Sequence, residues 1–235
     1  TLDTQGEEAF KRLRSNLQFC GSHMKIIGLT SCIPNEGKSS ISFNLAESLA
    51  QAGHKTVLID ADLRMSILLA SLRVNKPVKG LTHFLSGMAP EEDIINQTNI
   101  NNLDIIFSGP VPPNPSELLG GQSFLALVNK LNESYDYIII DTPPLGSVID
   151  GAVIAKLCNG MILIISANKI SYKFAKKVKQ QLEVTGCTIL GAVLNKADVG
   201  RQREYYGYGE KKLGMKDRVL AFGRWITGRR KKIVN

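Results

Sequence analysis

The sequence predicts an α/β fold: a doubly wound, mainly parallel sheet with helices on both faces. Short apolar runs alternate with stretches of helical character along most of the chain, as in folds built from strand–helix–strand units. The runs are continuously apolar, which is typical of strands that are buried on both faces of a parallel sheet. The predicted strands are residues 25–31, 55–60, 103–108, 135–141, 160–166 and 188–195.

Residues 1–22 are predicted to form an amphipathic helix at the N-terminus. Within the stretch EAFKRLRSNLQF, Phe10, Leu13 and Leu17 recur at helical spacing and give the helix one apolar face. Packing against the rest of the protein explains this face. Three polar residues are then left for another role, namely Glu8, Lys11 and Arg14.

The first predicted strand ends in SCIPNEGKSS, which resembles the phosphate-binding pattern GxxxxGK[ST]. Gly37, Lys38 and Ser39 match the pattern, while Cys32 stands where the first glycine belongs. In such a turn, backbone N–H groups face a phosphate at the N-terminus of a helix. Lys38 would neutralise phosphate oxygens and the Ser39 hydroxyl would bind Mg²⁺. Asn35 can supply the positive φ for which glycine is usual.

The helix that follows this loop is predicted over residues 39–53, with Gly53 at its C-terminal end. Its N-terminus would lie at the carboxyl end of the first strand, where ligands bind in open α/β sheets. The predicted nucleotide contacts are Pro34, Asn35, Glu36, Gly37, Lys38, Ser39, Ser40 and, from a later strand end, Asn195.

The second predicted strand ends in LIDADLR, which places Asp60 and Asp62 two residues apart. Side chains of an extended segment repeat every two residues, so both carboxylates can face the same site. Such an aspartate can hold a Mg²⁺-bound water or accept a hydroxyl proton during phosphoryl transfer. Lys38, Asp60 and Asp62 are therefore the predicted catalytic residues.

The fourth predicted strand, YIIIDTPP, ends in Asp141 and fits the Walker B pattern, whose carboxylate orders Mg²⁺. The motifs thus predict that Ser39 and Asp141 bind the metal. Each motif alone has an ordinary alternative: an accidental GKS, a helix cap, or an apolar run that happens to end in aspartate. Together, in this order along the chain, they predict ATP or GTP binding on a P-loop NTPase fold.

A further strand end carries Asn195, Lys196 and Asp198, the NKxD arrangement that reads guanine in GTPases. In this class of sheet, Asn195 has two alternative roles, contacting an adenine or closing a turn. The stretch SGPVPPNPSELL, residues 108–119, is predicted to be a rigid loop that leads into a helix after Pro115.

The net charge of +8 lies almost entirely in the C-terminal segment. Residues 210–235 hold nine basic and two acidic residues, a net +7, so the rest of the chain is nearly neutral. A neutral domain with a basic tail argues against nucleic acid as the partner and suggests an electrostatic anchor. The four cysteines show neither a CxxC pair nor zinc spacing, which is typical of reduced thiols in a cytosolic protein.

Membrane insertion is not expected, because the longest apolar runs fall far short of the roughly 20 residues that a spanning helix needs. The tail has an alternative membrane role. Its apolar residues share one helical face next to a basic GRRKK stretch, which fits either an interfacial helix or packing on the domain. These residues are Met215, Val219, Phe222 and Ile226, with Trp225 beside them.

Residues 200–209 contain three of the six tyrosines of the chain, Tyr205, Tyr206 and Tyr208. They alternate with glycine among charged residues, in the stretch REYYGYGE. Together with LIDADLR, IIIDTPP, PNEGKSS, SGPVPPNPSELL and EAFKRLRSNLQF, this tyrosine cluster resembles the bacterial protein-tyrosine kinases of capsule and exopolysaccharide systems. The resemblance extends from about residue 7 to about residue 209.

The resemblance implies ATP-dependent phosphorylation of the tyrosine cluster in trans, between subunits of a ring-like homo-oligomer, and regulation of polysaccharide synthesis or export. Residues 23–199 would be the kinase domain, in which Lys38 and Ser39 bind ATP–Mg²⁺, Asp60 is the base, and Asp62 and Asp141 serve the metal together with Ser39. It implies that Glu8, Lys11 and Arg14 make the oligomer contacts. It also implies an activator segment from a membrane adaptor, either fused upstream or on a separate chain, that holds a cytoplasmic kinase at the inner face of the membrane.

The chain departs from the family pattern at two positions. The oligomerisation motif is commonly Glu-x-x-Arg-x-x-Arg, and Lys11 replaces its first arginine, although lysine cannot form the bidentate fork of arginine. Asn35 stands where family loops usually carry glycine.

Two rival functions share the predicted fold. A partitioning or positioning ATPase would carry an additional lysine five positions before Lys38, where this chain has Ile33. A non-catalytic nucleotide-binding regulator would not need the complete set of Lys38, Ser39 and three aspartates. The isoleucine at position 33, the complete set of site residues and the tyrosine cluster all favour the kinase.

Overall fold

The computed structural model describes residues 4–74 and 77–197, and the chain divides into two units, Thr1–Asn195 and Lys196–Asn235. The predicted tyrosine cluster (200–209) and basic tail (210–235) lie outside the described residues, so their boundaries remain predictions.

The described residues form one seven-stranded sheet with the order β3-β4-β2-β5-β1-β6-β7. All neighbouring strands are parallel except β3 and β4, which are antiparallel. The predicted fold class is therefore confirmed. The strands are β1 Ile26–Ser31, β2 Thr56–Asp60, β3 Asn96–Gln97, β4 Leu103–Ile106, β5 Tyr137–Asp141, β6 Gly160–Ser166 and β7 Ile189–Asn195.

Strand β3 was not predicted from the sequence. It consists of two polar residues at the edge of the sheet, Asn96 and Gln97, so it has neither an apolar run nor a clear alternation. The six predicted strands all exist, and their bounds differ from the prediction by at most two residues.

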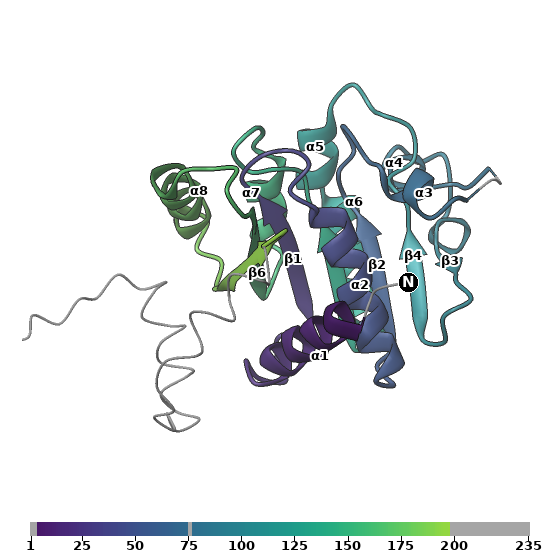
Figure 1. Cartoon of the computed structure of the whole chain (residues 1–235). Coiled ribbons are helices and arrows are strands. Elements are labelled where there is room, and N and C mark those ends of the chain that lie inside the picture. Colours follow the sequence, from purple (N-terminus) through teal and green to yellow (C-terminus); the bar gives the residue numbers. More distant parts are fainter. Residues whose placement is uncertain (1–3, 75–76, 198–235) are drawn as a thin grey trace, which may run out of the picture. The chain divides into compact units, whose positions relative to one another are not determined.

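Both faces of the sheet are covered by helices, because successive strand residues point to opposite faces and both sets are apolar. On one face Leu58 and Ile139 pack in a core with Leu45 of helix α2, and on the other Ile59 and Ile140 pack with Phe124 of helix α6. Figure 1 shows α1 and α2 in front of the central strands. The helices are α1 Thr4–Gln18, α2 Lys38–Gln51, α3 Leu68–Ser71, α4 Leu81–Leu85, α5 Pro115–Gly120, α6 Gln122–Ser134, α7 Asp150–Ala155 and α8 Tyr172–Val184, with a 3₁₀ turn at Glu91–Asp93.

Helix α1 packs on α2 through the predicted apolar face, since Phe10, Leu13 and Leu17 all join the core beneath α2. Arg14 donates from Nη1 to the carbonyl oxygen of Ser48 at 2.7 Å and to its hydroxyl at 3.1 Å. Arg14 thus anchors α1 within its own chain. The other two predicted oligomer contacts, Glu8 and Lys11, form an exposed ion pair of 2.8 Å with each other.

Two further expectations concern cysteines and membrane spans. Cys20, Cys32, Cys158 and Cys187 are all free in the structure. Across the described residues, every helix is too short or too polar to span a bilayer.

Candidate active site

The loop between β1 and α2 has the backbone conformation that a phosphate-binding turn requires. Asn35 has φ 63° and Gly37 has φ 88°, both in the left-handed region, as predicted for Asn35. Gly37 is constrained a second time, because a Cβ atom there would lie 2.2 Å from Nδ2 of Asn195. A side chain at position 37 would therefore be disfavoured both by backbone strain and by a collision.

The buried carboxylate of Glu36 holds this loop in place. Its Oε2 accepts hydrogen bonds from the N–H groups of Cys32 (2.7 Å) and Ile33 (2.9 Å), and its Oε1 accepts one from Ser166 (2.8 Å) at the end of β6. Because the side chain is committed to these three bonds, we assign it a role in positioning the loop. Asn195 donates from Nδ2 to the carbonyl oxygen of Glu36 at 2.8 Å and supports the same loop.

Lys38, the first residue of α2, is buried among acidic groups. Its Nζ lies 2.7 Å from Oδ1 of Asp141 and 3.9 Å from Oδ2 of Asp62. It also lies 3.4 Å from the hydroxyl of Ser39. The hydroxyl of Ser42, one helical turn after Lys38, donates to the same Asp141 oxygen at 2.9 Å. Sequence reasoning missed Ser42, and its only signal was its i+4 spacing from Lys38.

The register of the sheet brings the predicted catalytic carboxylates together, because Asp60 of β2 is paired directly with Asp141 of β5. The N–H of Asp62 donates to Oδ1 of Asp60 at 3.3 Å, and the hydroxyl of Ser66 donates to the other oxygen. Lys38, Asp60, Asp62 and Asp141 therefore meet at the carboxyl edge of three neighbouring strands, as the sequence predicted.

Burial, and then the nearby negative charge of Asp141, raises the pKa of Asp60 to about 7, although the hydrogen bond from Ser66 opposes the shift. Only 1% of Asp60 is exposed. A carboxylate whose pKa lies near neutral pH is suited to accept a proton from a hydroxyl group.

The predicted Mg²⁺ ligands fit a site that is completed by substrate phosphates. Oδ2 of Asp141 is buried and has no hydrogen-bond partner among the described residues, while its other oxygen is used by Lys38 and Ser42. The described part of the chain contains no group of three or more His, Cys, Asp or Glu that could hold a metal by itself. Mg²⁺ typically takes one or two carboxylates together with phosphate and water oxygens, which matches Ser39, Asp62 and Asp141.

A second ionic cluster, not predicted from the sequence, lies next to these carboxylates. Arg64 donates from Nε to Asp150 at 2.6 Å and from one Nη to Asp150 and to Ser116, both at 3.2 Å. Ser116 also donates to Asp150. Burial alone would raise the pKa of Asp150, but the hydrogen bonds from Arg64 and Ser116 outweigh it and hold that pKa below its ordinary value.

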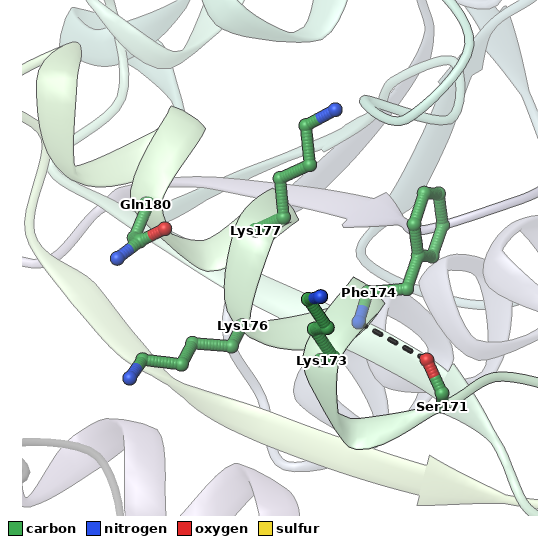
Figure 2. A pocket seen from close by; sticks show the side chains of 6 residues that line it. All are labelled: Ser171, Lys173, Phe174, Lys176, Lys177 and Gln180. Carbon is green, nitrogen blue, oxygen red and sulfur yellow. Dashed lines mark hydrogen bonds between the residues drawn. The ribbon is translucent and has the colours of Figure 1, made fainter.

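A hollow of about 610 Å³ lies on α8 and is open to solvent. Figure 2 shows Lys173, Lys176 and Lys177 projecting from the helix around it, with the Ser171 hydroxyl capping the N–H of Phe174. None of the predicted site residues lines this hollow. The predicted site residues lie instead at the carboxyl edge of β1, β2 and β5, which is the candidate active site.

Comparison with known proteins gives consistent results. The family model described as an AAA domain matches residues 24–184. The tyrosine-protein kinase CpsD of Streptococcus agalactiae is 44% identical over 207 residues, which cover 87% of this chain and 90% of that protein.

Two solved structures are similar over most of their length. The chimerical protein CapA2B2 is 37% identical with a TM-score of 0.78, covering 81% of this chain and 84% of that one. The kinase domain of the Escherichia coli tyrosine kinase ETK is 33% identical with a TM-score of 0.76, covering 82% and 77%. The sequence relatives, the fold and the cluster of lysine and carboxylates all agree. The chain therefore belongs to the bacterial protein-tyrosine kinases of capsule and exopolysaccharide systems, within the P-loop NTPase fold.

Proposed function

We propose that the chain transfers the γ-phosphoryl group of ATP to Tyr205, Tyr206 and Tyr208 of another copy, and so regulates capsule or exopolysaccharide synthesis or export. The observation that carries this proposal is the convergence of Lys38 with Asp60, Asp62 and Asp141 at one edge of the sheet. Lys38 and Asp141 alone would suit any P-loop ATPase. Asp60, buried and with a raised pKa, supplies the proton acceptor that transfer to a hydroxyl needs.

In the proposed reaction Asp60 takes the proton of the tyrosine hydroxyl while the phenolic oxygen forms a bond to the γ-phosphorus, and the bond to ADP breaks. Lys38 leaves its contact with Asp141 to bind phosphate oxygens and offset their charge. Ser39, Asp62 and Asp141 would hold Mg²⁺, which supplies positive charge to the phosphates when bound. The backbone of residues 34–40 would bind the phosphates, and Asn195 would lie near the base.

The described tyrosines are poorer acceptors than the cluster. Tyr135 is 6% exposed, and its hydroxyl donates to Asp104 at 2.7 Å. Burial, and then this hydrogen bond, raises the pKa of Tyr135 above its ordinary value. Tyr137 lies in β5 with its ring edge against His54. Tyr172 is exposed, but it belongs to the first turn of α8, whose backbone is helical. An acceptor must reach into another subunit's site, which favours the glycine-rich cluster.

We further propose that the copies form a ring-like homo-oligomer through Glu8, Lys11 and Arg14, which would exchange their bonds within one chain for bonds to the neighbouring copy. A membrane adaptor, supplied upstream or as a separate chain, would activate the kinase and hold it at the inner face of the cell membrane. Protein substrates other than the chain itself would be recognised through exposed tyrosines, and nucleic acid is not a proposed partner.

One assay separates this proposal from its rivals. The purified chain is incubated with γ-labelled ATP and Mg²⁺, and the products are resolved by phosphoamino-acid analysis. Labelled phosphotyrosine is expected. Release of free phosphate alone would indicate a switch ATPase of the partitioning type, and the absence of both products would indicate a non-catalytic regulator.

Phosphorylation of the tyrosine cluster should loosen the assembly. Three phosphates add roughly −5 to −6 at neutral pH, which offsets most of the +7 of residues 210–235 and places like negative charge on the tyrosine clusters of neighbouring copies, so that the clusters repel one another. Mass spectrometry and light-scattering size analysis before and after ATP treatment measure both effects. The triple Tyr→Phe variant is the control and should keep its size. Label found mainly on Tyr172, or an unchanged assembly after full modification, would contradict this prediction.

The basic tail should bind anionic membranes. Wild-type chain and a chain ending at Gly209 are compared by co-sedimentation with vesicles containing about one third anionic lipid, since each basic residue near such a surface contributes about 1 kcal/mol. The full chain should sediment with the vesicles and lose binding at high salt. Equal sedimentation of the two chains would exclude a role of the tail in membrane binding.

A further inference from the structure

The segment that follows the two catalytic aspartates of β2 exposes apolar side chains next to the reacting groups. Its polar groups face inward, because the N–H of Met65 donates to Asp62 at 3.1 Å and the hydroxyl of Ser66 donates to Asp60. Two apolar side chains of the same segment face outward: Met65 is 75% exposed and Ile67 is 53% exposed. Apolar groups displayed beside an active site are typical of a binding surface.

The ion pair between Arg64 and Asp150 adds a third apolar side chain to this surface. Asp150 is completely buried and receives two hydrogen bonds from the guanidinium, so the loop after β2 and the loop after β5 are fixed to each other. Ile149, the residue before Asp150, is 66% exposed. Met65 and Ile149 are therefore the sequence neighbours of the two partners of one salt bridge, whose Asp150 end is buried and whose Arg64 end is partly exposed.

We propose that Met65, Ile67 and Ile149, here named the acceptor face, bind the tyrosine-bearing segment of a second copy of this chain. One aromatic ring of that segment packs on the acceptor face while the adjacent tyrosine brings its hydroxyl to Asp60. This inference rests on the proposed function and adds to it the surface that selects the acceptor.

Two arguments identify the occupant. A hydroxyl that gives its proton to Asp60 must lie within about 3 Å of that carboxylate, and Ser66, which stands between Met65 and Ile67, already contacts the same carboxylate, so an acceptor in this position comes close to both apolar residues. The thioether of Met65 is also a favourable partner for an aromatic ring, at about 0.3–1.5 kcal/mol per contact.

The tyrosine-bearing segment follows strand β7 in the sequence. Strand β7 runs parallel to β6 and ends at Asn195, at the same carboxyl edge as Asp60, and residues 198–235 continue beyond the described structure. Adjacent tyrosines at 205 and 206 would supply one ring to react and one to bind.

A double-mutant cycle between enzyme and peptide tests the proposal. The enzyme is the full chain with Tyr205, Tyr206 and Tyr208 replaced by alanine, so that it neither labels itself nor competes. Both peptides span residues 201–210 with Tyr205 as acceptor and alanine at 208, and they carry phenylalanine or alanine at 206. Each is assayed with this enzyme and with the same enzyme carrying Met65→Ser and Ile149→Ser.

With the intact acceptor face, phenylalanine at 206 should raise kcat/KM about tenfold over alanine, which corresponds to about 1.4 kcal/mol. With the serine variant the two peptides should differ by less than about twofold, while the KM for ATP stays the same. The matched control is Val184→Ser, which changes an apolar side chain that is 88% exposed at the end of α8 and should retain the tenfold preference.

The same preference in the serine variant would overturn the proposal, as would a wild-type enzyme that labels its own tail but neither peptide. These outcomes differ from a failure of the proposed function, in which the wild-type chain itself makes no phosphotyrosine. Because Met65 and Ile149 are exposed, the substitutions should leave the melting temperature unchanged, which circular dichroism checks.

Discussion

Replacing Lys38 with methionine should lower the rate of tyrosine phosphorylation by at least about 100-fold, the usual cost of losing a group that stabilises charge in the transition state. The same change should also lower stability. Lys38 and Asp141 form a buried ion pair at 2.7 Å, with 7% and 1% of their side chains exposed. Removing one partner of such a pair typically costs about 3–5 kcal/mol, because the remaining charge is left buried.

Two further variants separate the loss of activity from the loss of stability. Lys38→Met combined with Asp141→Asn removes both charges, so it should recover much of the stability while remaining inactive. Lys173→Met removes an exposed lysine of α8 and should change neither property. Radiolabel incorporation measures activity and urea unfolding measures stability. Phosphotyrosine at the wild-type level in a folded Lys38→Met protein would exclude the assigned role.

Replacing Asp60 with asparagine should have opposite effects on activity and stability. The rate should fall by about 100- to 10,000-fold, the range that general base catalysis contributes. Stability at pH 8 should rise, because the variant no longer buries a carboxylate next to Asp141. The wild-type kcat/KM should increase with pH through an inflection near 7, where Asp60 loses its proton, and that dependence should vanish in the variant.

The effect of pH on stability follows from the same shift. The pKa of Asp60 is about 7 in the folded protein and about 3.9 in an unfolded chain. Between these values the folded state binds more protons, so the stabilising contribution of Asp60 is complete below about pH 4 and is lost as the pH rises through 7. Thermal melts of wild type and Asp60→Asn at pH 5 and pH 8 measure this, and an equal difference at both pH values would contradict it.

The sequence predicted those parts of the site that local pattern encodes. Strand ends, the left-handed Asn35 and the meeting of Asp60 with Asp141 all follow from apolar runs and from the rule that parallel strands end at one edge. Contacts between distant side chains were not predictable in this way. The bond from Ser166 to Glu36 joins residues 130 positions apart, and the salt bridge from Arg64 to Asp150 joins residues 86 apart.

The bracing role of the Glu36 side chain was not predictable from its motif. Its position inside the loop predicts a contact with ATP, which its backbone can make, while its buried side chain accepts three backbone N–H bonds and holds the loop. A sequence pattern identifies which residues occupy a loop and carries no information about which of them point inward. Ser42 and Asp150 were missed for the same reason, since only the folded helix and sheet bring them to the site.

The strand order also has a consequence for how the chain folds during synthesis. Strand β1 lies between β5 and β6, and β2 lies between β4 and β5, so the first two strands to emerge from the ribosome are not neighbours. Strand β1 finds its first partner, β5, only after more than one hundred further residues have been synthesised. Pairing of this kind is slow, because a long loop must close before any contact forms, and it leaves strand edges open to other chains. The edges of β1 therefore stay unpaired in the nascent chain until β5 has been synthesised.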